Sequence, residues 1–159
     1  MATWQTLLAK MVKDAPIEPV YFCIRPPVGK AWPKLLPSTP TLVEFFSLCD
    51  GGNLSALEIF SMDTIKAERA TMLRAIDMQT IAAGPEHIFV FGYNPQGYVY
   101  FVDTENDLVS AYNPKTAEWD HHNQSFESFL EDLFTPGSTY HDGLTDEWTQ
   151  VLEQVENMA

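Results

Sequence analysis

The sequence has little positive charge. Its 159 residues include nine Lys and Arg against 22 Asp and Glu, which gives a formal net charge of -13 at pH 7. Binding to nucleic acid phosphates needs clustered Lys and Arg, so this composition disfavours a nucleic acid partner. Residues 1–74 contain eight of the nine basic residues and seven acids, whereas residues 75–159 contain Lys115 alone and fifteen acids. The acidic second half is therefore either a solubilising surface or a surface that captures a basic protein.

Membrane and export signals are also missing from the sequence. No apolar run is long enough to cross a bilayer, and the first residues lack the basic and apolar regions of a signal peptide. The two cysteines, Cys23 and Cys49, lie inside apolar runs and show no metal-binding spacing. We therefore expect a cytoplasmic protein with two reduced, buried thiols, and a disulfide between them is the alternative.

Common catalytic and metal-binding motifs are absent as well. The sequence has no Cys-x-x-Cys or His-x-x-x-His pair, no Gly-x-Ser-x-Gly and no phosphate-binding glycine loop. His121 and His122 follow Asp120, but adjacent histidines rarely converge on one ion, so we expect them in an exposed turn. Asp103 ends an aromatic run, and we expect its carboxylate to cap the turn that follows. The sequence therefore predicts no catalytic residue, no metal and no cofactor, in a protein that is not an enzyme.

What the sequence does contain is a series of short apolar runs between residues 87 and 119. β-Branched and aromatic residues dominate these runs, and Gly, Asn, Pro and Asp separate them. Each connection is too short to hold a crossover helix, so the runs predict an antiparallel meander. The expected strands are residues 88–91, 98–103 and 108–112, with further candidates at 116–119, 57–60 and 20–24.

Five segments are expected to form helices, because apolar residues recur in them at helical spacing. They are residues 3–13, 40–50, 64–82, 125–134 and 145–158. Ser38 or Thr39 is expected to cap the second helix. Gly51 and Gly52 are expected to end it, since glycine tolerates the left-handed conformation common at helix C-termini.

The third helix is predicted to be the longest. Ser61 or Asp63 is expected to cap its start. Its three basic residues, Lys66, Arg69 and Arg74, are expected on a solvated face that makes local ion pairs, in preference to forming a binding patch.

Two segments flank this predicted framework. Residues 14–40 contain seven of the eleven prolines, so a helix is excluded there, and we expect an ordered wrap across the core with Trp32 as its anchor. Residues 138–159 add a C-terminal helix, either as an addition or as a dimerisation element. We predict one α+β domain over residues 1–159, with an antiparallel sheet of four to six strands and helices packed mainly on one face.

Three motifs occur in order along this framework. Phe91-Gly92 and Gly97 form a Phe-Gly-x-x-x-x-Gly turn, and the aromatic strand after it ends in Asp103. A helix followed by a glycine pair precedes the turn at residues 40–52, and Ser-Phe-Glu-Ser-Phe-Leu follows it at residues 125–130. Over residues 35–134 the chain thereby resembles the SMI1/KNR4 (SUKH) superfamily.

The resemblance implies a non-enzymatic protein-binding module with a SUKH-type fold. Such modules are similar to bacterial immunity proteins, which bind and neutralise a cognate toxin, often a nuclease. The implied partner is a basic toxin domain, whose cleft the protein would occlude. The alternative implied by the same superfamily is a cytosolic regulatory or scaffold protein.

The predicted partner-binding residues lie in the acidic second half. Tyr98 and Tyr100 share one face of their strand by the two-residue alternation of β-structure, although either face of the sheet could be core. Tyrosine is enriched at interface hot spots, so these two are candidate anchors. The predicted acidic contacts are Glu105, Asp107, Glu127, Glu131 and Asp132.

Overall fold

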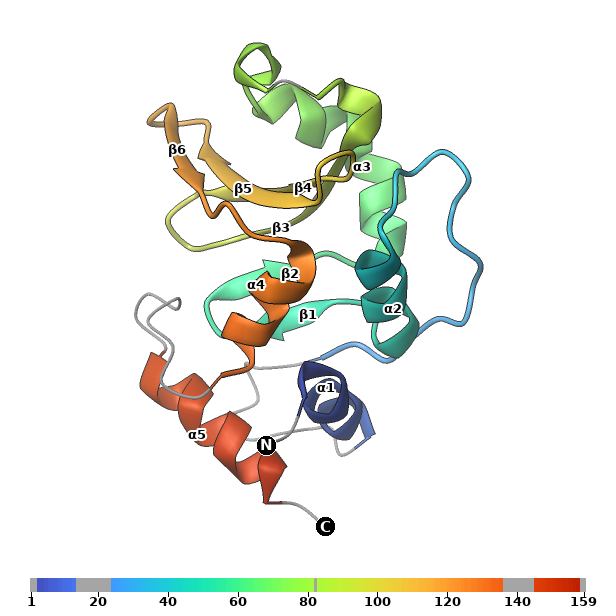
Figure 1. The fold of residues 1–159 in the computed structure, drawn as a ribbon, viewed down its shortest axis with the longest axis vertical. Helices are drawn as coiled ribbons and strands as arrows, with labels where there is room; N and C mark the ends of the chain where they lie inside the picture. The colour runs from blue at the N-terminus through green and yellow to red at the C-terminus, as the bar shows by residue number, and fades with distance from the viewer. Residues whose placement is uncertain (1–2, 14–23, 82, 136–144, 158–159) are drawn as a thin grey trace.

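The computed structural model describes residues 3–13, 24–81, 83–135 and 145–157. Its centre is one sheet in which each strand is antiparallel to the next along the chain (Figure 1). The strands are β1 (Gly52–Leu54), β2 (Leu57–Ile59), β3 (Ile88–Tyr93), β4 (Val99–Asp103), β5 (Leu108–Asn113) and β6 (Glu118–His121). The predicted antiparallel meander is confirmed, and the last strand lies two residues later than 116–119. Residues 20–23 of the candidate strand at 20–24 lie outside the described residues, and Ile24 forms a single bridge to Gly52.

Five α-helices surround the sheet. They are α1 (Trp4–Lys13), α2 (Pro40–Leu48), α3 (Met62–Ala75), α4 (Phe126–Leu133) and α5 (Thr145–Glu156), with short 3-10 turns η1 (Met78–Thr80) and η2 (Pro85–His87) between α3 and β3. The side chains of Thr39, Ser61 and Ser125 accept hydrogen bonds from the first turns of α2, α3 and α4. The predicted α+β class is confirmed.

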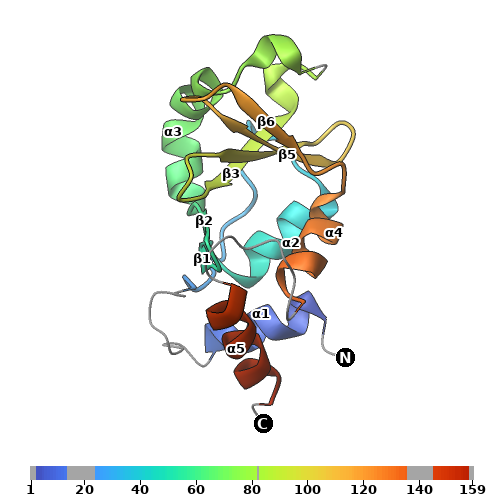
Figure 2. The same ribbon diagram turned by 90° about the vertical axis from the view of Figure 1, so that its left-hand side faces the viewer.

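The middle of the sheet, β3 and β4, is buried on both faces. One face, which carries Phe89, Phe91 and Tyr100, packs into a large core with residues of α1, α2, α4 and α5. Phe126 of α4 occupies this core, with ring centroids 5.2 Å from Phe91 and 5.8 Å from Phe45. Figure 2 shows α4 and α2 on this side of the sheet and α3 on the other. The helices therefore lie mainly on one face, as predicted.

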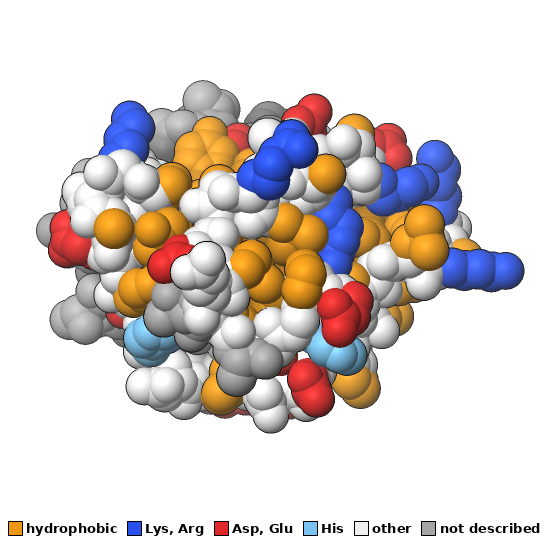
Figure 3. Space-filling model, turned by 90° about the horizontal axis from the view of Figure 1, so that it is seen from above, with side chains coloured by type: hydrophobic (Ala, Val, Ile, Leu, Met, Phe, Trp, Pro, Cys, Tyr) orange, Lys and Arg blue, Asp and Glu red, His pale blue; other side chains and the backbone are white. Residues whose placement is uncertain are grey.

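A smaller core covers the opposite face, where Val90 and Phe101 pack against the end of α3 and the segment that follows it. Several apolar side chains around this core stay partly exposed. They are Phe60, Met72, Leu73, Met78, Ile81, Val99 and Trp119. In a view from above, Figure 3 shows apolar side chains grouped near the centre with Lys and Arg side chains beside them.

The end of α2 differs from the prediction. The helix ends at Leu48, and Cys49 caps it in an extended conformation, so the glycine pair does not terminate it. Gly51 does have a positive φ of +75°, but a side chain there would run into the carbonyl oxygens of Ile59 and Phe60. The glycine is required because the start of the sheet lies against the chain leaving β2. Cys49 itself is fully buried, and burial raises the pKa of its thiol to about 12. Cys23 lies outside the described residues.

The prediction for the third helix was wrong in two respects. Helix α3 ends at Ala75, before residue 82, because Ile76 leaves the helix in an extended conformation and packs into the smaller core. Arg69 is not on a solvated face. Its guanidinium donates to the carbonyl oxygens of Ile88 at 2.7 Å and Pro85 at 2.9 Å, and so joins α3 to the start of β3. Lys66 and Arg74 are exposed, as expected.

Helix α5 packs into the main core. Its apolar residues Trp148, Val151, Leu152 and Val155 are all 0% exposed, and the helix contacts α1. The indole nitrogen of Trp148 donates a 2.6 Å hydrogen bond to the carbonyl of Leu133, which ties α5 to the end of α4. The apolar face is thus already covered by the chain itself. Residues 138–144 lie outside the described residues.

Within the proline-rich segment, residues 24–39 are described and 14–23 are not. Trp32 packs against Phe89 with a centroid distance of 5.3 Å and against Phe46 at 6.0 Å. Arg25 donates to the carbonyl of Asp50 at 2.7 Å and to that of Ile59 at 2.5 Å. These contacts fix the segment across the ends of α2 and β2.

Candidate protein-binding surface

The β4–β5 turn is hydrogen-bonded to the first residue of α4. The Asp103 carboxylate accepts hydrogen bonds from the backbone N–H of Glu105 at 3.0 Å and of Asn106 at 3.3 Å. The predicted turn-capping role of Asp103 is confirmed. Asp107 adopts a positive φ of 53°, and its carboxylate accepts from the Phe126 N–H at 3.4 Å. The turn and the first residues of α4 therefore form one continuous surface.

The outer side of α4 is acidic. Glu127, Glu131 and Asp132 are all exposed, and Asp132 accepts a 3.1 Å hydrogen bond from the Gln124 amide. Among the described residues, no Lys or Arg lies within ion-pair distance of these three carboxylates. Glu127 and Glu131 are four residues apart on one helix, a spacing at which like charges destabilise a helix by about 0.2–0.5 kcal/mol. The surface is thus electrostatically unfavourable in the isolated protein.

The two tyrosines predicted as anchors differ in exposure. Tyr100 is 7% exposed and packs against Phe91 and Phe129, so it is a core residue and cannot anchor a partner. The prediction was wrong for Tyr100 because the tyrosine-bearing face of β4 is the one that α4 covers. Tyr98, which directly precedes β4, is half-buried.

Two acids that sequence reasoning missed lie near Tyr98. Partial burial raises the pKa of Tyr98, and the carboxylates of Glu118 and Asp120 raise it further. Both acids are exposed on β6, where they pair with Asn113 and Ala111 of β5. Alternation along the strand would have placed Glu118 and Asp120 on one face, but the expected strand at 116–119 stopped one residue before Asp120.

Glu105 has a partial counter-charge. The imidazole of His87 lies 3.9 Å from the Glu105 carboxylate and 3.6 Å from that of Glu86, so it forms ion pairs only when it is protonated. Its side chain is 42% exposed. A basic partner could therefore displace this contact at little cost, since exposed pairs contribute about 0–1 kcal/mol.

The two histidines do not form the exposed turn that the sequence predicted: His121 ends β6, and His122 follows it. His122 is largely buried, with only 8% of its side chain exposed, and its ring packs against Tyr100 at 5.6 Å and Phe129 at 5.7 Å. Its Nε2 lies 3.5 Å from the Asp120 carboxylate. His121 is exposed and stacks on Trp119 at 5.1 Å. In the described ranges, no group of three His, Cys, Asp or Glu side chains is arranged to hold a metal ion.

We expect His122 to make stability fall in mild acid. Burial lowers the pKa of His122, and the Asp120 carboxylate opposes this only in part. The unfolded chain, with a pKa of about 6.5, then binds more protons than the folded protein, so stability is complete above that pH and declines as the pH falls. Urea midpoints of the wild type and His122→Gln, measured at about pH 7.5 and pH 5.5, should converge in acid. Parallel pH profiles would show that His122 does not titrate with folding.

Comparisons with known proteins found no match. No protein-family model, no curated protein and no solved structure matches the chain. Within the described residues, no helix combines the length and the apolar character needed to cross a membrane. The functional interpretation therefore depends on the chemistry of the surface itself and on the sequence motifs.

Proposed function

We propose that this protein is a non-enzymatic module that captures a basic protein domain through one acidic surface. The acidic surface consists of Glu105, Asp107, Glu127, Glu131 and Asp132. The observation that carries this proposal is the set of exposed carboxylates on α4, for which the described residues provide no Lys or Arg. Lys115 is the single basic residue after position 74, so counter-charges in this half of the chain are scarce.

Binding a basic partner should be favourable because the described residues of the isolated protein give the carboxylates of the acidic surface no Lys or Arg partner. Like charges held on rigid elements repel one another, and a basic partner relieves that repulsion on binding. Complementary charge also steers the encounter and raises the association rate. Tyr98, near Glu118 and Asp120 just before the start of β4, would supply an aromatic contact.

The motif resemblance supports a narrower proposal about the partner. A SUKH-type module resembles bacterial immunity proteins, so the basic partner would be a toxin domain of the nuclease type. The protein would neutralise it by occlusion, with carboxylates covering the basic cleft that binds the toxin's substrate. A neutral partner would instead favour the cytosolic regulatory or scaffold function.

Charge reversal on α4 tests this proposal. The tagged protein is used to capture partners from a lysate of its own organism, and affinity is then measured with the purified partner. Glu127→Lys/Glu131→Lys should weaken binding at least tenfold, a loss of about 1.4 kcal/mol, because it replaces attraction by repulsion at the centre of the surface.

A control pair separates local charge from net charge. Glu153→Lys/Glu156→Lys changes two exposed residues of α5 and gives the same net charge. This pair should bind within about twofold of the wild type, since it lies outside the acidic surface. Equal losses in both pairs would mean that binding depends on overall charge, and no loss in either would contradict the proposed surface.

A further inference from the structure

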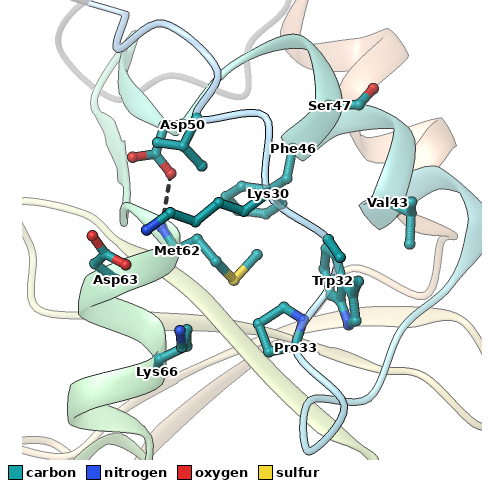
Figure 4. Close-up of a pocket in the computed structure, with 12 residues that line it drawn as sticks. Lys30, Trp32, Pro33, Val43, Phe46, Ser47, Asp50, Met62, Asp63 and Lys66 are labelled. Atoms are coloured by element: carbon teal, nitrogen blue, oxygen red, sulfur yellow. Dashed lines mark hydrogen bonds between the residues drawn. The ribbon is translucent and has the colours of Figure 1, made fainter.

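A small pocket lies between the proline-rich segment, the end of α2 and the start of α3 (Figure 4). Trp32, Phe46 and Met62 line its apolar side. Its volume of about 110 Å³ is smaller than the cavity of about 150 Å³ that holds benzene. The side chains of Lys30 and Lys66, which also line it, are exposed to solvent. The pocket therefore selects no class of ligand, whereas the edge of the sheet at β6 has a more specific chemistry.

Strand β6 forms a free edge of the sheet. It is the last strand in the order β1 to β6 and pairs with β5. Figure 1 shows it at the outer margin of the sheet. Among the described residues, no backbone hydrogen bond joins residues 118–121 to a segment outside the sheet. Unpaired N–H and C=O groups along such an edge are a template for a further strand.

The hydrogen bonds at the two ends of the β5–β6 hairpin show how the backbone groups of β5 are directed. The Val109 N–H donates to the carbonyl oxygen of Gln124 at 2.9 Å. The carbonyl oxygen of Asn113 accepts from the Ala117 N–H at 2.8 Å. These directions alternate along a strand, so the odd-numbered residues of β5 direct their N–H and C=O groups towards β6.

The free backbone groups of β6 belong to Trp119 and His121. Two of the odd-numbered residues of β5 pair with Glu118 and Asp120, whose N–H and C=O groups therefore face β5. The alternate residues, Trp119 and His121, consequently direct their N–H and C=O groups away from the sheet. A segment added in antiparallel orientation would exchange its hydrogen bonds with these two residues.

One side of this edge is negatively charged. Glu118 and Asp120 lie on the same side of β6 by alternation, and both are exposed. Asp120 lies 3.5 Å from the Nε2 of His122. In the described ranges, no Lys or Arg lies within ion-pair distance of either acid. A segment along the edge would therefore meet uncompensated negative charge on this side.

The other side of the edge adjoins the smaller core. Trp119 is partly exposed, and its ring centroid lies 4.7 Å from that of Tyr112. The strand register places Val99, Tyr112 and Trp119 side by side on β4, β5 and β6. This apolar row ends at β6, so an apolar side chain on an added strand would extend it.

We propose that the edge of β6 binds an extended segment of a partner protein as a seventh, antiparallel strand. In that segment, Lys or Arg alternates with β-branched apolar residues. The basic side chains would lie beside Glu118 and Asp120, and the apolar side chains beside Trp119. The edge shares no residue with the acidic surface, so this inference is independent of the proposed function.

A second copy of the chain fits this edge less well than a basic segment. In the antiparallel register that pairs Trp119 with His121 of the other copy, the two Asp120 carboxylates lie directly opposite each other. Like charges in that position destabilise a strand pair. A basic segment reverses the sign of this contact, and the charge of the edge therefore selects it.

Titration calorimetry of the full chain with synthetic peptides tests the proposal. The probe is acetyl-Lys-Val-Lys-Val-Lys-Val-Lys-amide at about 50 mM salt, where charge pairs are weakly screened. It should bind, and the same peptide with glutamate in place of lysine should not. Replacement of its valines by serine should weaken binding at least tenfold. Absence of binding, or equal binding of the serine peptide, would overturn the proposal.

Backbone methylation of the peptide tests the added strand itself. Residues that exchange hydrogen bonds with Trp119 and His121 in an antiparallel pair have side chains on the Trp119 side, so they are the valines. Methylation of the valine backbone nitrogens should weaken binding at least tenfold. Methylation of the lysine backbone nitrogens should change affinity by less than about threefold, because those N–H groups point away from β6. Any other order of the two effects would contradict antiparallel strand addition.

Two pairs of substitutions in the protein locate the peptide. Glu118→Gln/Asp120→Asn removes the charges of the edge and should weaken peptide binding at least tenfold. Glu127→Gln/Glu131→Gln removes two charges from α4 and should leave affinity within about twofold of the wild type. Equal losses, or no loss from the edge pair, would overturn the proposal. Because the two pairs share no residue, failure at the edge leaves capture through the acidic surface untouched.

Discussion

Gly51→Ala is expected to reduce the free energy of unfolding by about 3–5 kcal/mol. Gly51 has a φ of +75°, a conformation that costs alanine about 1–2 kcal/mol. An alanine Cβ would also meet two backbone carbonyl oxygens and come within 2.9 Å of the Arg25 guanidinium. The backbone oxygens of Ile59 and Phe60 cannot move away easily, so the loss approaches a third or more of a typical domain's stability.

Gly29→Ala is the matched control for this prediction. Gly29 has a similar φ of +69°, but no atom lies within 4 Å of the position that its Cβ would take. Gly29→Ala should therefore reduce the free energy of unfolding only by the cost of the left-handed backbone conformation, about 1 kcal/mol. Urea denaturation of both variants measures the difference. Similar midpoints for the two variants would show that the contacts of the added Cβ at residue 51 do not reduce stability.

Trp148→Ala is expected to cost about 3–5 kcal/mol, the usual range for removing a fully buried large aromatic side chain. The indole is 0% exposed, contacts the ring of Phe134, and donates to the Leu133 carbonyl. The substitution leaves both a cavity and an unpaired carbonyl oxygen. We expect the midpoint of urea unfolding to fall accordingly.

The same helix provides a control and a test of the helix's role. Gln150→Ala changes an exposed residue of α5 and should alter stability by less than about 0.5 kcal/mol. If α5 were instead a dimerisation element, Trp148→Ala would shift the protein from dimer to monomer without loss of monomer stability. Sedimentation together with denaturation distinguishes these outcomes.

The sheet could be predicted from the sequence because its signals are local. Each turn between β3 and β6 contains Gly, Asn, Pro or Asp, and the runs between the turns are short and rich in β-branched and aromatic residues. The same local signals could not reveal the role of Gly51, because its neighbours are the carbonyls of Ile59 and Phe60. Arg69 was misplaced for a related reason, since its acceptors are carbonyls at Pro85 and Ile88.

The residues of the candidate sites could likewise be predicted only in part from the sequence. The acids of α4 and the β4–β5 turn could be named from composition and helix periodicity. Glu105 and the three acids of α4 are exposed, whereas Asp107 is half-buried. The exposure of Tyr98 and the burial of Tyr100 could not be predicted, because alternation does not say which face a helix covers. The pocket lined by Trp32, Phe46 and Met62 could not be predicted from the sequence, because these residues come from three separate segments.

The salt dependence of partner capture tests the central claim most directly. The account predicts that the wild-type protein captures a basic protein at about 50 mM salt and that its affinity falls at least tenfold by about 500 mM, because screening weakens exposed charge pairs. A captured partner that is neutral, or one whose affinity is unchanged over that range, would contradict capture through the acidic surface.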